Sequence, residues 1–123
     1  MMTAGEVVRG FYAAVEKRDL AEARTYLGDD LVFVGLFETY RGPDAYLAAL
    51  TGLLGVTRRL DVRTVIAEGD EAAIFFDLET VAPVEANTFV AEWHQVAEGK
   101  IRRVQSAFDG RAFAAMFSGE GQR

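Results

Sequence analysis

The chain has 123 residues, one His, no Cys and a formal net charge of −6. Because nucleic-acid binding is driven largely by Lys and Arg meeting phosphates, this acidic balance argues against a nucleic-acid partner. The lack of cysteine excludes disulfides, thiolate nucleophiles and cysteine-ligated metals. Half of the residues are hydrophobic, yet no apolar run approaches the length of a membrane span. We therefore expect a single cytoplasmic domain over residues 1–123 that contacts no membrane.

The first half of the chain carries the signals of three helices and one strand. A capping box and apolar residues at helical spacing predict a first helix up to about Arg18. A second, short helix capped by Asp19 is expected to stop at Gly28. Residues 31–37 are rich in β-branched and aromatic side chains and predict a strand. Pro43 opens a third helix.

After Gly55 the pattern changes from helical to alternating, which predicts four antiparallel strands joined by turns. The last three strands are expected at residues 71–81, 87–97 and 101–109. In the first of the four, one face is expected to carry Leu60, Val62, Thr64 and Ile66. Helices that precede a run of antiparallel strands indicate an α+β fold. The tail, residues 118–123, is expected to be disordered.

The most informative motif lies in the third strand of this run, where Glu92, Trp93 and His94 are consecutive. Side chains alternate between the faces of a strand, so Glu92 and His94 share one face, roughly 6–7 Å apart. The pair predicts either acid–base chemistry or a polar patch whose groups bond to each other or to a nearby hydroxyl. No metal site is expected, because one His and one carboxylate fall short of the three ligands typical of catalytic zinc.

Several stretches, taken in order and spacing, resemble the SnoaL-like branch of the nuclear transport factor 2-like superfamily. They are residues 8–14, 18–20, 27–33, 40–45 and 99–109. The resemblance covers about residues 4–117. It implies a cone of the cystatin-like α+β roll type, in which a curved antiparallel sheet wraps around three helices and leaves a pocket open at one end. It also implies kinship with ketosteroid isomerases, polyketide cyclases, epoxide hydrolases and binding domains without activity.

The catalytic positions of such relatives are only partly kept. An isomerase uses an Asp base with an oxyanion hole of a Tyr and a protonated Asp. The resemblance puts the Tyr at Phe11, the base at Gly35 and the protonated Asp at Glu92, so steroid isomerisation is not expected. The Asp-Arg-Asp set of the epoxide hydrolases would fall on Glu92, Val90 and Ser106, which lack the Arg and one Asp. The acid and His of the polyketide cyclases would fall near Ser106 and Glu92, so that match is partial as well.

We expect the pocket to be mostly apolar. Its predicted lining is Phe11, Val15, Phe33, Leu50, Phe76, Leu78, Glu92, His94, Val104, Ser106 and Phe108. The residues expected to touch a ligand are Phe11, Phe33, Tyr40, Phe76, Ser106 and Phe108. Tyr40 is placed near the mouth of the cone, whereas Tyr12 is expected to pack between helix and sheet.

Three functions remain open at this point. The first is a small-molecule enzyme of the isomerase, cyclase or hydrolase kind, without cofactor. Its acid–base pair would be Glu92 and His94, acting on an apolar substrate with a carbonyl or epoxide. The second is a non-catalytic binding module for a small apolar ligand. The third is a scaffold domain whose pocket is vestigial.

The outward face of the sheet is expected to carry Phe75, Phe89 and Trp93, together with Asp77 and Glu79 as solvated or interface residues. A sizeable exposed apolar patch usually marks an interface. We therefore expect a homodimer that pairs through this convex sheet face. The alternative is that the C-terminal segment, residues 113–117, folds back over part of the patch.

Overall fold

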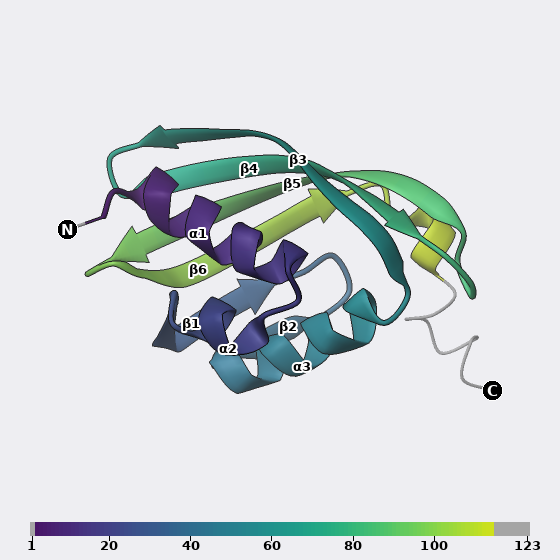
Figure 1. Cartoon of the computed structure of the whole chain (residues 1–123), viewed down its shortest axis with the longest axis horizontal. Coiled ribbons are helices and arrows are strands. Elements are labelled where there is room, and N and C mark those ends of the chain that lie inside the picture. Colours follow the sequence, from purple (N-terminus) through teal and green to yellow (C-terminus); the bar gives the residue numbers. More distant parts are fainter. Residues whose placement is uncertain (1, 115–123) are drawn as a thin grey trace.

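The computed structural model of this protein describes residues 2–114 and shows an α+β fold with one strongly curved sheet (Figure 1). The helical elements are α1 (Ala4–Glu16), α2 (Leu20–Arg24), α3 (Pro43–Leu54) and a short 3-10 turn, η1 (Arg111–Phe113). The strands are β1 (Leu27–Val34), β2 (Thr39–Arg41), β3 (Thr57–Glu68), β4 (Glu71–Thr80), β5 (Ala86–Ala97) and β6 (Lys100–Phe108). The predicted α+β cone is confirmed. The tail at 118–123 lies outside the described residues.

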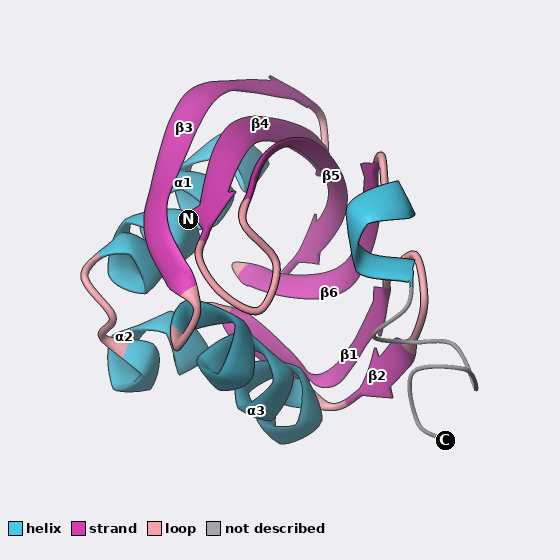
Figure 2. Cartoon of the chain, turned by 90° about the vertical axis from the view of Figure 1, so that its right-hand side faces the viewer, coloured by secondary structure: helices cyan, strands magenta, loops and turns pink. Residues whose placement is uncertain are grey.

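The six strands form one sheet in the order β2-β1-β6-β5-β4-β3. The run from β3 to β6 is the predicted antiparallel meander, whereas β1 lies parallel to β6. Figure 2 shows the sheet curling round on itself without closing. Helix α1 packs against β3 to β6, and α3 packs against β1, β2 and β3. The helices and the curled sheet therefore enclose the space between them.

Helix α1 is fixed at both ends by side-chain hydrogen bonds. At its start the Thr3 hydroxyl accepts from the Glu6 backbone N–H at 3.1 Å, and the Glu6 carboxylate accepts from the Thr3 N–H at 2.8 Å. Just past its end, the Arg18 guanidinium donates to the carbonyls of Leu54 and Thr57 at 2.8 and 2.9 Å. These two bonds tie the end of α1 to the end of α3 and the start of β3. The apolar stripe of α1 is thereby held against the sheet.

Two boundaries and one strand near the start of the sheet differ from expectation. Helix α2 ends at Arg24 and does not reach Gly28. Strand β1 begins at Leu27, because Ile101 of β6 pairs with Leu27 and donates its N–H to the Tyr26 carbonyl at 2.8 Å. Strand β2 was not predicted. It is short and forms its ladder with β1 alone, so it leaves no periodic pattern in the sequence.

A bulge in β3 reverses its expected faces. Val62 pairs with Phe76, and the next paired residue, Thr64, faces Phe75, so Arg63 is the extra residue. One inserted residue moves every later side chain to the other face. Val65 consequently packs against the core, and Ile66 is 62% exposed. The expectation that Thr64 and Ile66 share a face with Leu60 and Val62 was wrong for this reason.

The predicted faces of β4 are confirmed. Ile74, Phe76 and Leu78 are buried on the inner face. Asp77 and Glu79 point outward and pair with arginines of β3, Asp77 with Arg63 at 2.7 Å. None of the described helices is long and apolar enough to cross a membrane.

Candidate functional site

A cavity of about 430 Å³ opens between the helices and the inner face of the sheet. Its wall comes from α1, β1, α3 and the four meander strands, and it falls in the size range of small-molecule sites. Expected lining residues found on the wall are Val15, Phe33, Leu50, Phe76, Leu78, Glu92, Ser106 and Phe108. Expected lining residues that lie elsewhere are Phe11, His94 and Val104, all of them in the buried core.

The polar part of the wall is built around Glu92 of β5. Its carboxyl group is almost fully buried, with 7% of the residue exposed. Ser106 of β6 is its cross-strand partner and donates a hydrogen bond to it. On the opposite side, the Tyr12 hydroxyl of α1 donates to Glu92 Oε1 through a short hydrogen bond. Helix and sheet thus meet at this carboxyl group.

His94 lies behind this pair and has no contact with the cavity. It is completely buried, and its Nδ1 is 3.3 Å from the carbonyl oxygen of Ala72. A carbonyl only accepts, so Nδ1 carries the proton and Nε2 is left as an acceptor. Nε2 is 3.3 Å from the Tyr12 hydroxyl. The structure therefore brings Glu92 and His94 into one buried network, joined through Tyr12.

The Tyr12 hydroxyl has one proton and two acceptors within reach. When Glu92 is ionised, Tyr12 donates to its carboxylate. When Glu92 is protonated, its own O–H can donate to the Tyr12 oxygen, and Tyr12 can turn its proton to His94 Nε2. Both protonation states of Glu92 therefore keep their hydrogen bonds. This is the property that a buried group needs if it is to gain and lose a proton.

Burial shifts the two titratable groups in opposite directions. It raises the pKa of Glu92 from 4.5 to about 7, with the Ser106 hydrogen bond opposing the rise. It lowers the pKa of His94 from 6.5 to about 4, with the hydrogen bond to the Ala72 carbonyl opposing the fall. Near neutral pH, Glu92 therefore occupies both protonation states while His94 stays neutral. Glu92 is the group equipped for proton transfer, and His94 serves as a fixed acceptor.

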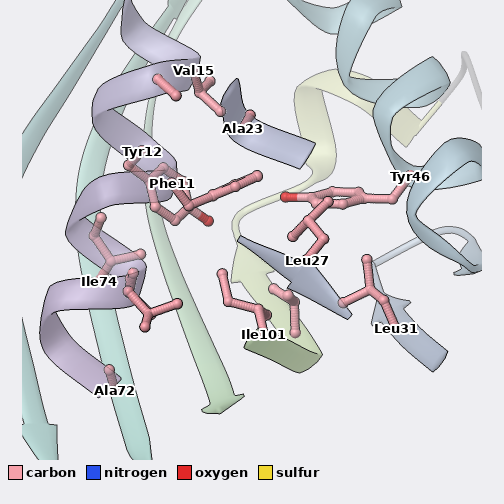
Figure 3. Close-up of a cluster of buried hydrophobic side chains, with 14 of the residues drawn as sticks. Phe11, Tyr12, Val15, Ala23, Leu27, Leu31, Tyr46, Ala72, Ile74 and Ile101 are labelled. Carbon is pink, nitrogen blue, oxygen red and sulfur yellow. The ribbon is translucent and has the colours of Figure 1, made fainter. Parts of the chain in front are cut away.

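The structure exchanges the expected roles of two neighbours on α1. Phe11, predicted to touch a ligand, is 1% exposed and lies in the core, with its ring 6.0 Å from that of Tyr46. Tyr12, predicted only to pack, lines the cavity and bonds to Glu92. Figure 3 shows both rings reaching inward from the same helix. Both belong to one wide apolar stripe, so helical spacing could not tell which of them faces the cavity.

The mouth of the cavity carries the predicted contact Tyr40. Its ring lies 6.0 Å from that of Phe33, and partial burial together with a hydrogen bond from its hydroxyl to Glu38 raises the pKa of Tyr40. Gly35, the position at which the resemblance implied a lost base, sits on the wall beside them. A Cβ at Gly35 would lie 3.0 Å from the Glu38 carbonyl oxygen and from the Phe33 ring. A side chain at Gly35 would therefore require these neighbours to shift.

The donor set of the described residues offers little to a metal ion. No three His, Asp or Glu side chains within residues 2–114 are grouped as ligands of one metal would be. Among the cavity residues that sequence reasoning missed, Tyr12 and Tyr46 carry hydroxyl groups. The signal that could have found them is chemical, because a tyrosine in a buried stripe must find a partner for its hydroxyl.

The raised pKa of Glu92 predicts how Glu92→Gln changes the pH dependence of stability. From pH 4.5 to 7 the unfolded chain loses the Glu92 proton and the folded chain keeps it, so this group lowers stability as pH rises, by about 3 kcal/mol. From pH 4 to 6.5 His94 has the opposite effect, because the unfolded chain holds the extra proton. Relative to wild type, the free energy of unfolding of Glu92→Gln should be unchanged below pH 4.5. Above pH 7 it should be higher by up to about 3 kcal/mol.

Urea unfolding at pH 4.5 and pH 8 measures that difference. The matched control is Glu79→Gln on the outer face, which should change stability by less than about 1 kcal/mol at both pH values. A Glu92→Gln difference that is the same at both pH values would show that Glu92 does not titrate as a buried carboxyl.

Comparison with known proteins shows which family this chain resembles in sequence and in fold. The profile of the SnoaL-like domain family matches residues 8–104. A search of curated proteins gave no match. A protein of known structure from Kribbella flavida DSM 17836 is similar over 100% of both chains, with 20% identity and a TM-score of 0.84.

Two further solved structures are similar in fold. An NTF2-like protein of unknown function from Cytophaga hutchinsonii ATCC 33406 shares 17% identity over 90% of this chain and 94% of its own, with a TM-score of 0.78. An LEH-like epoxide hydrolase from M. tuberculosis shares 21% identity over 93% of this chain and 88% of its own, with a TM-score of 0.76. The profile match over residues 8–104, most of the chain, shows that this protein belongs to the SnoaL-like domain family.

Proposed function

We propose that this protein acts on a small apolar molecule by proton transfer at Glu92, without a cofactor, as an isomerase, cyclase or hydrolase does. One observation carries the proposal: Glu92 is a buried carboxyl group on the wall of a mostly apolar cavity, with a pKa of about 7. General acid–base catalysis is most effective when the pKa of the group lies near the working pH. The Tyr12 hydroxyl keeps the group bonded in both of its states.

The proposed step begins with ionised Glu92 facing a substrate carbonyl. The carboxylate removes a proton from the carbon beside the carbonyl, the C–H electron pair moves into the new double bond, and the oxygen becomes an enolate. Protonated Glu92 then returns that proton to the same or another carbon. While Glu92 holds the proton, the Tyr12 hydroxyl can turn to His94 Nε2, 3.3 Å away. His94 acts here as a positioning residue, because it does not reach the cavity.

A non-catalytic binding module is the second candidate, and a specific observation favours it. The groups that would act on a substrate, Tyr12 and Glu92, already bond to each other. Gly35 also lacks the carboxyl base that the resemblance to ketosteroid isomerases implies at this position. A vestigial pocket is harder to reconcile with a cavity of about 430 Å³ that side chains have not filled.

Exchange of α-protons separates these functions. The probe is 2-tetralone, an apolar ketone whose α-protons exchange with D₂O and can be followed by ¹H NMR. Wild-type protein should accelerate the exchange, with a rate that rises with pH and levels off above about pH 7 as Glu92 ionises. Glu92→Gln should lower the catalysed rate about 100-fold or more. The control Glu79→Gln, on the outer face of the sheet, should exchange at the wild-type rate.

Titrating the protein with 2-tetralone in the same NMR samples also yields a dissociation constant. Binding without accelerated exchange would refute the catalytic proposal and favour the binding module. No binding at millimolar 2-tetralone would count against both.

We propose in addition that two copies pair through the convex sheet face. Phe75 and Phe89 stack there with ring centroids 6.2 Å apart, and Phe89 is 52% exposed. The Arg63 guanidinium lies 5.2 Å from the centre of the Phe89 ring and also pairs with Asp77. Trp93 donates to the Glu71 carboxylate at 2.7 Å. These contacts leave an apolar patch with charged edges, as interfaces commonly have.

The cytoplasmic location expected from the sequence remains a prediction.

Sedimentation of Phe89→Glu tests the dimer. A charge at the centre of the patch would have to be buried on pairing, so this variant should sediment as a monomer while wild type sediments as a dimer. The control Ala48→Glu, on the exposed side of α3, should keep the wild-type mass. A wild-type protein that is already monomeric, or a dimeric Phe89→Glu, would refute this face as the interface.

A further inference from the structure

Tyr46 of α3 carries a buried hydroxyl that the proton transfer at Glu92 does not use. The side chain is 4% exposed, and its ring stacks on Phe33 with centroids 4.6 Å apart. Burial raises the pKa of the Tyr46 hydroxyl, and no hydrogen bond or charge contributes to that rise. The group is therefore a neutral hydrogen-bond donor at any physiological pH.

The Tyr46 hydroxyl must open into the cavity. In the part of the chain that the structure describes, every side-chain nitrogen or oxygen sealed from solvent has a hydrogen-bond partner. No hydrogen bond to the Tyr46 hydroxyl is found in that same part, so the hydroxyl faces space that a water molecule or a ligand can enter. Tyr46 lies on the cavity wall and is shut off from the outer surface, so that space is the cavity.

The Tyr46 side chain spans the interior between α3 and α1. In Figure 3 the Tyr46 ring extends from α3 across the interior, and its hydroxyl points toward Phe11 and Tyr12 of α1. The rings of Phe11 and Tyr46 are 6.0 Å apart, and those of Phe11 and Tyr12 are 5.0 Å apart. The unpaired donor is thus directed toward the helix that also carries the Tyr12 hydroxyl.

The remaining wall restricts what could accept this hydrogen bond. Aromatic rings from α1, α3, β1, β4 and β6 line the cavity, which favours a ligand that itself carries a flat ring. No Lys or Arg of the described residues lies on the wall, so an anionic acceptor would be buried without a counter-charge. A neutral carbonyl oxygen has the acceptor strength without that cost.

We propose that Tyr46 contacts the ligand and donates a hydrogen bond to a carbonyl oxygen on an aromatic or conjugated ring. The inference rests on the proposed function, since it concerns the same cavity, and it names the class of molecule bound there. In the free protein this hydroxyl can bond only to water within the cavity, and a ligand carbonyl would replace that water on binding. Tyr46 would then distinguish ring ketones from hydrocarbons of the same shape.

Two matched probes test this. The molecules 2-acetonaphthone and 2-isopropenylnaphthalene share a ring system and nearly the same shape, but only the ketone has an acceptor. Fluorescence titration should show that Tyr46→Phe weakens binding of the ketone about fivefold to tenfold, the worth of one hydrogen bond, and leaves binding of the alkene unchanged. The matched control is Tyr26→Phe, whose ring lies outside the cavity and which should bind both probes as wild type does.

Stability provides a second readout, because Tyr46→Phe keeps the stacked ring and removes only the hydroxyl. The melting temperature should be unchanged or slightly higher, since no protein partner loses a bond. Equal binding of the ketone by wild type and Tyr46→Phe would overturn the role of Tyr46 while leaving the apolar cavity as a binding site. Failure of wild type to bind either probe would overturn the proposed function together with this inference.

Discussion

Removing the Glu92 carboxyl from water is unfavourable, and the rest of the inner structure is arranged around that cost. The Tyr12 hydroxyl and Ser106 supply hydrogen bonds that water would otherwise supply. His94, held by the Ala72 carbonyl, gives Tyr12 a second acceptor. The carboxyl group can therefore change its charge and stay hydrogen-bonded to Tyr12 in both states. A lone carboxyl in the same cavity would lack this freedom.

Such a network requires helix and sheet to be placed accurately against each other. Tyr12 and Glu92 are 80 residues apart in sequence, so only the tertiary fold brings them together. The capping box at Thr3 and the bonds from Arg18 to the end of α3 fix α1 along its axis. The regular pairing of β4 with β5 fixes the position of Glu92 along the sheet, opposite Ile74. A shift of one residue in that pairing would turn Glu92 outward.

Sequence reasoning predicted the parts that depend on regular periodicity. The meander follows from alternating segments joined by turns. The inner faces of β4 and β5 and the shared face of Glu92 and His94 follow from alternation along a ladder without register shifts. The position of Arg63 shows the limit. A bulge is set by how two strands pair, so the sequence of β3 alone gives no sign that Val65 and Ile66 exchange faces.

The candidate site was predictable only in part for a related reason. Strand alternation has two faces and identifies Glu92 well, whereas the apolar stripe of a helix is broad. Phe11 and Tyr12 both lie within that stripe, and the choice between them depends on the exact rotation of α1 against a curved sheet. The apolar pattern of α3 does not distinguish Tyr46 from its aliphatic neighbours. The importance of Tyr46 emerges only when its hydroxyl is found without a partner beside a cavity.

Family membership accounts for the cone-shaped fold. The chemistry depends on the residues inside the cone. Structures that share about 20% identity share this fold, and fold alone does not define an activity. The central claim is that Glu92 titrates near neutral pH inside the cone. The direct measurement is ¹³C NMR of protein labelled at the glutamate side-chain carboxyl carbon, titrated from pH 3 to 9 in wild type and Glu92→Gln. One carboxyl should titrate at about pH 7 in wild type, and its signal should be missing from Glu92→Gln. If every glutamate titrated near its ordinary value of 4.5, the account of this site would be contradicted.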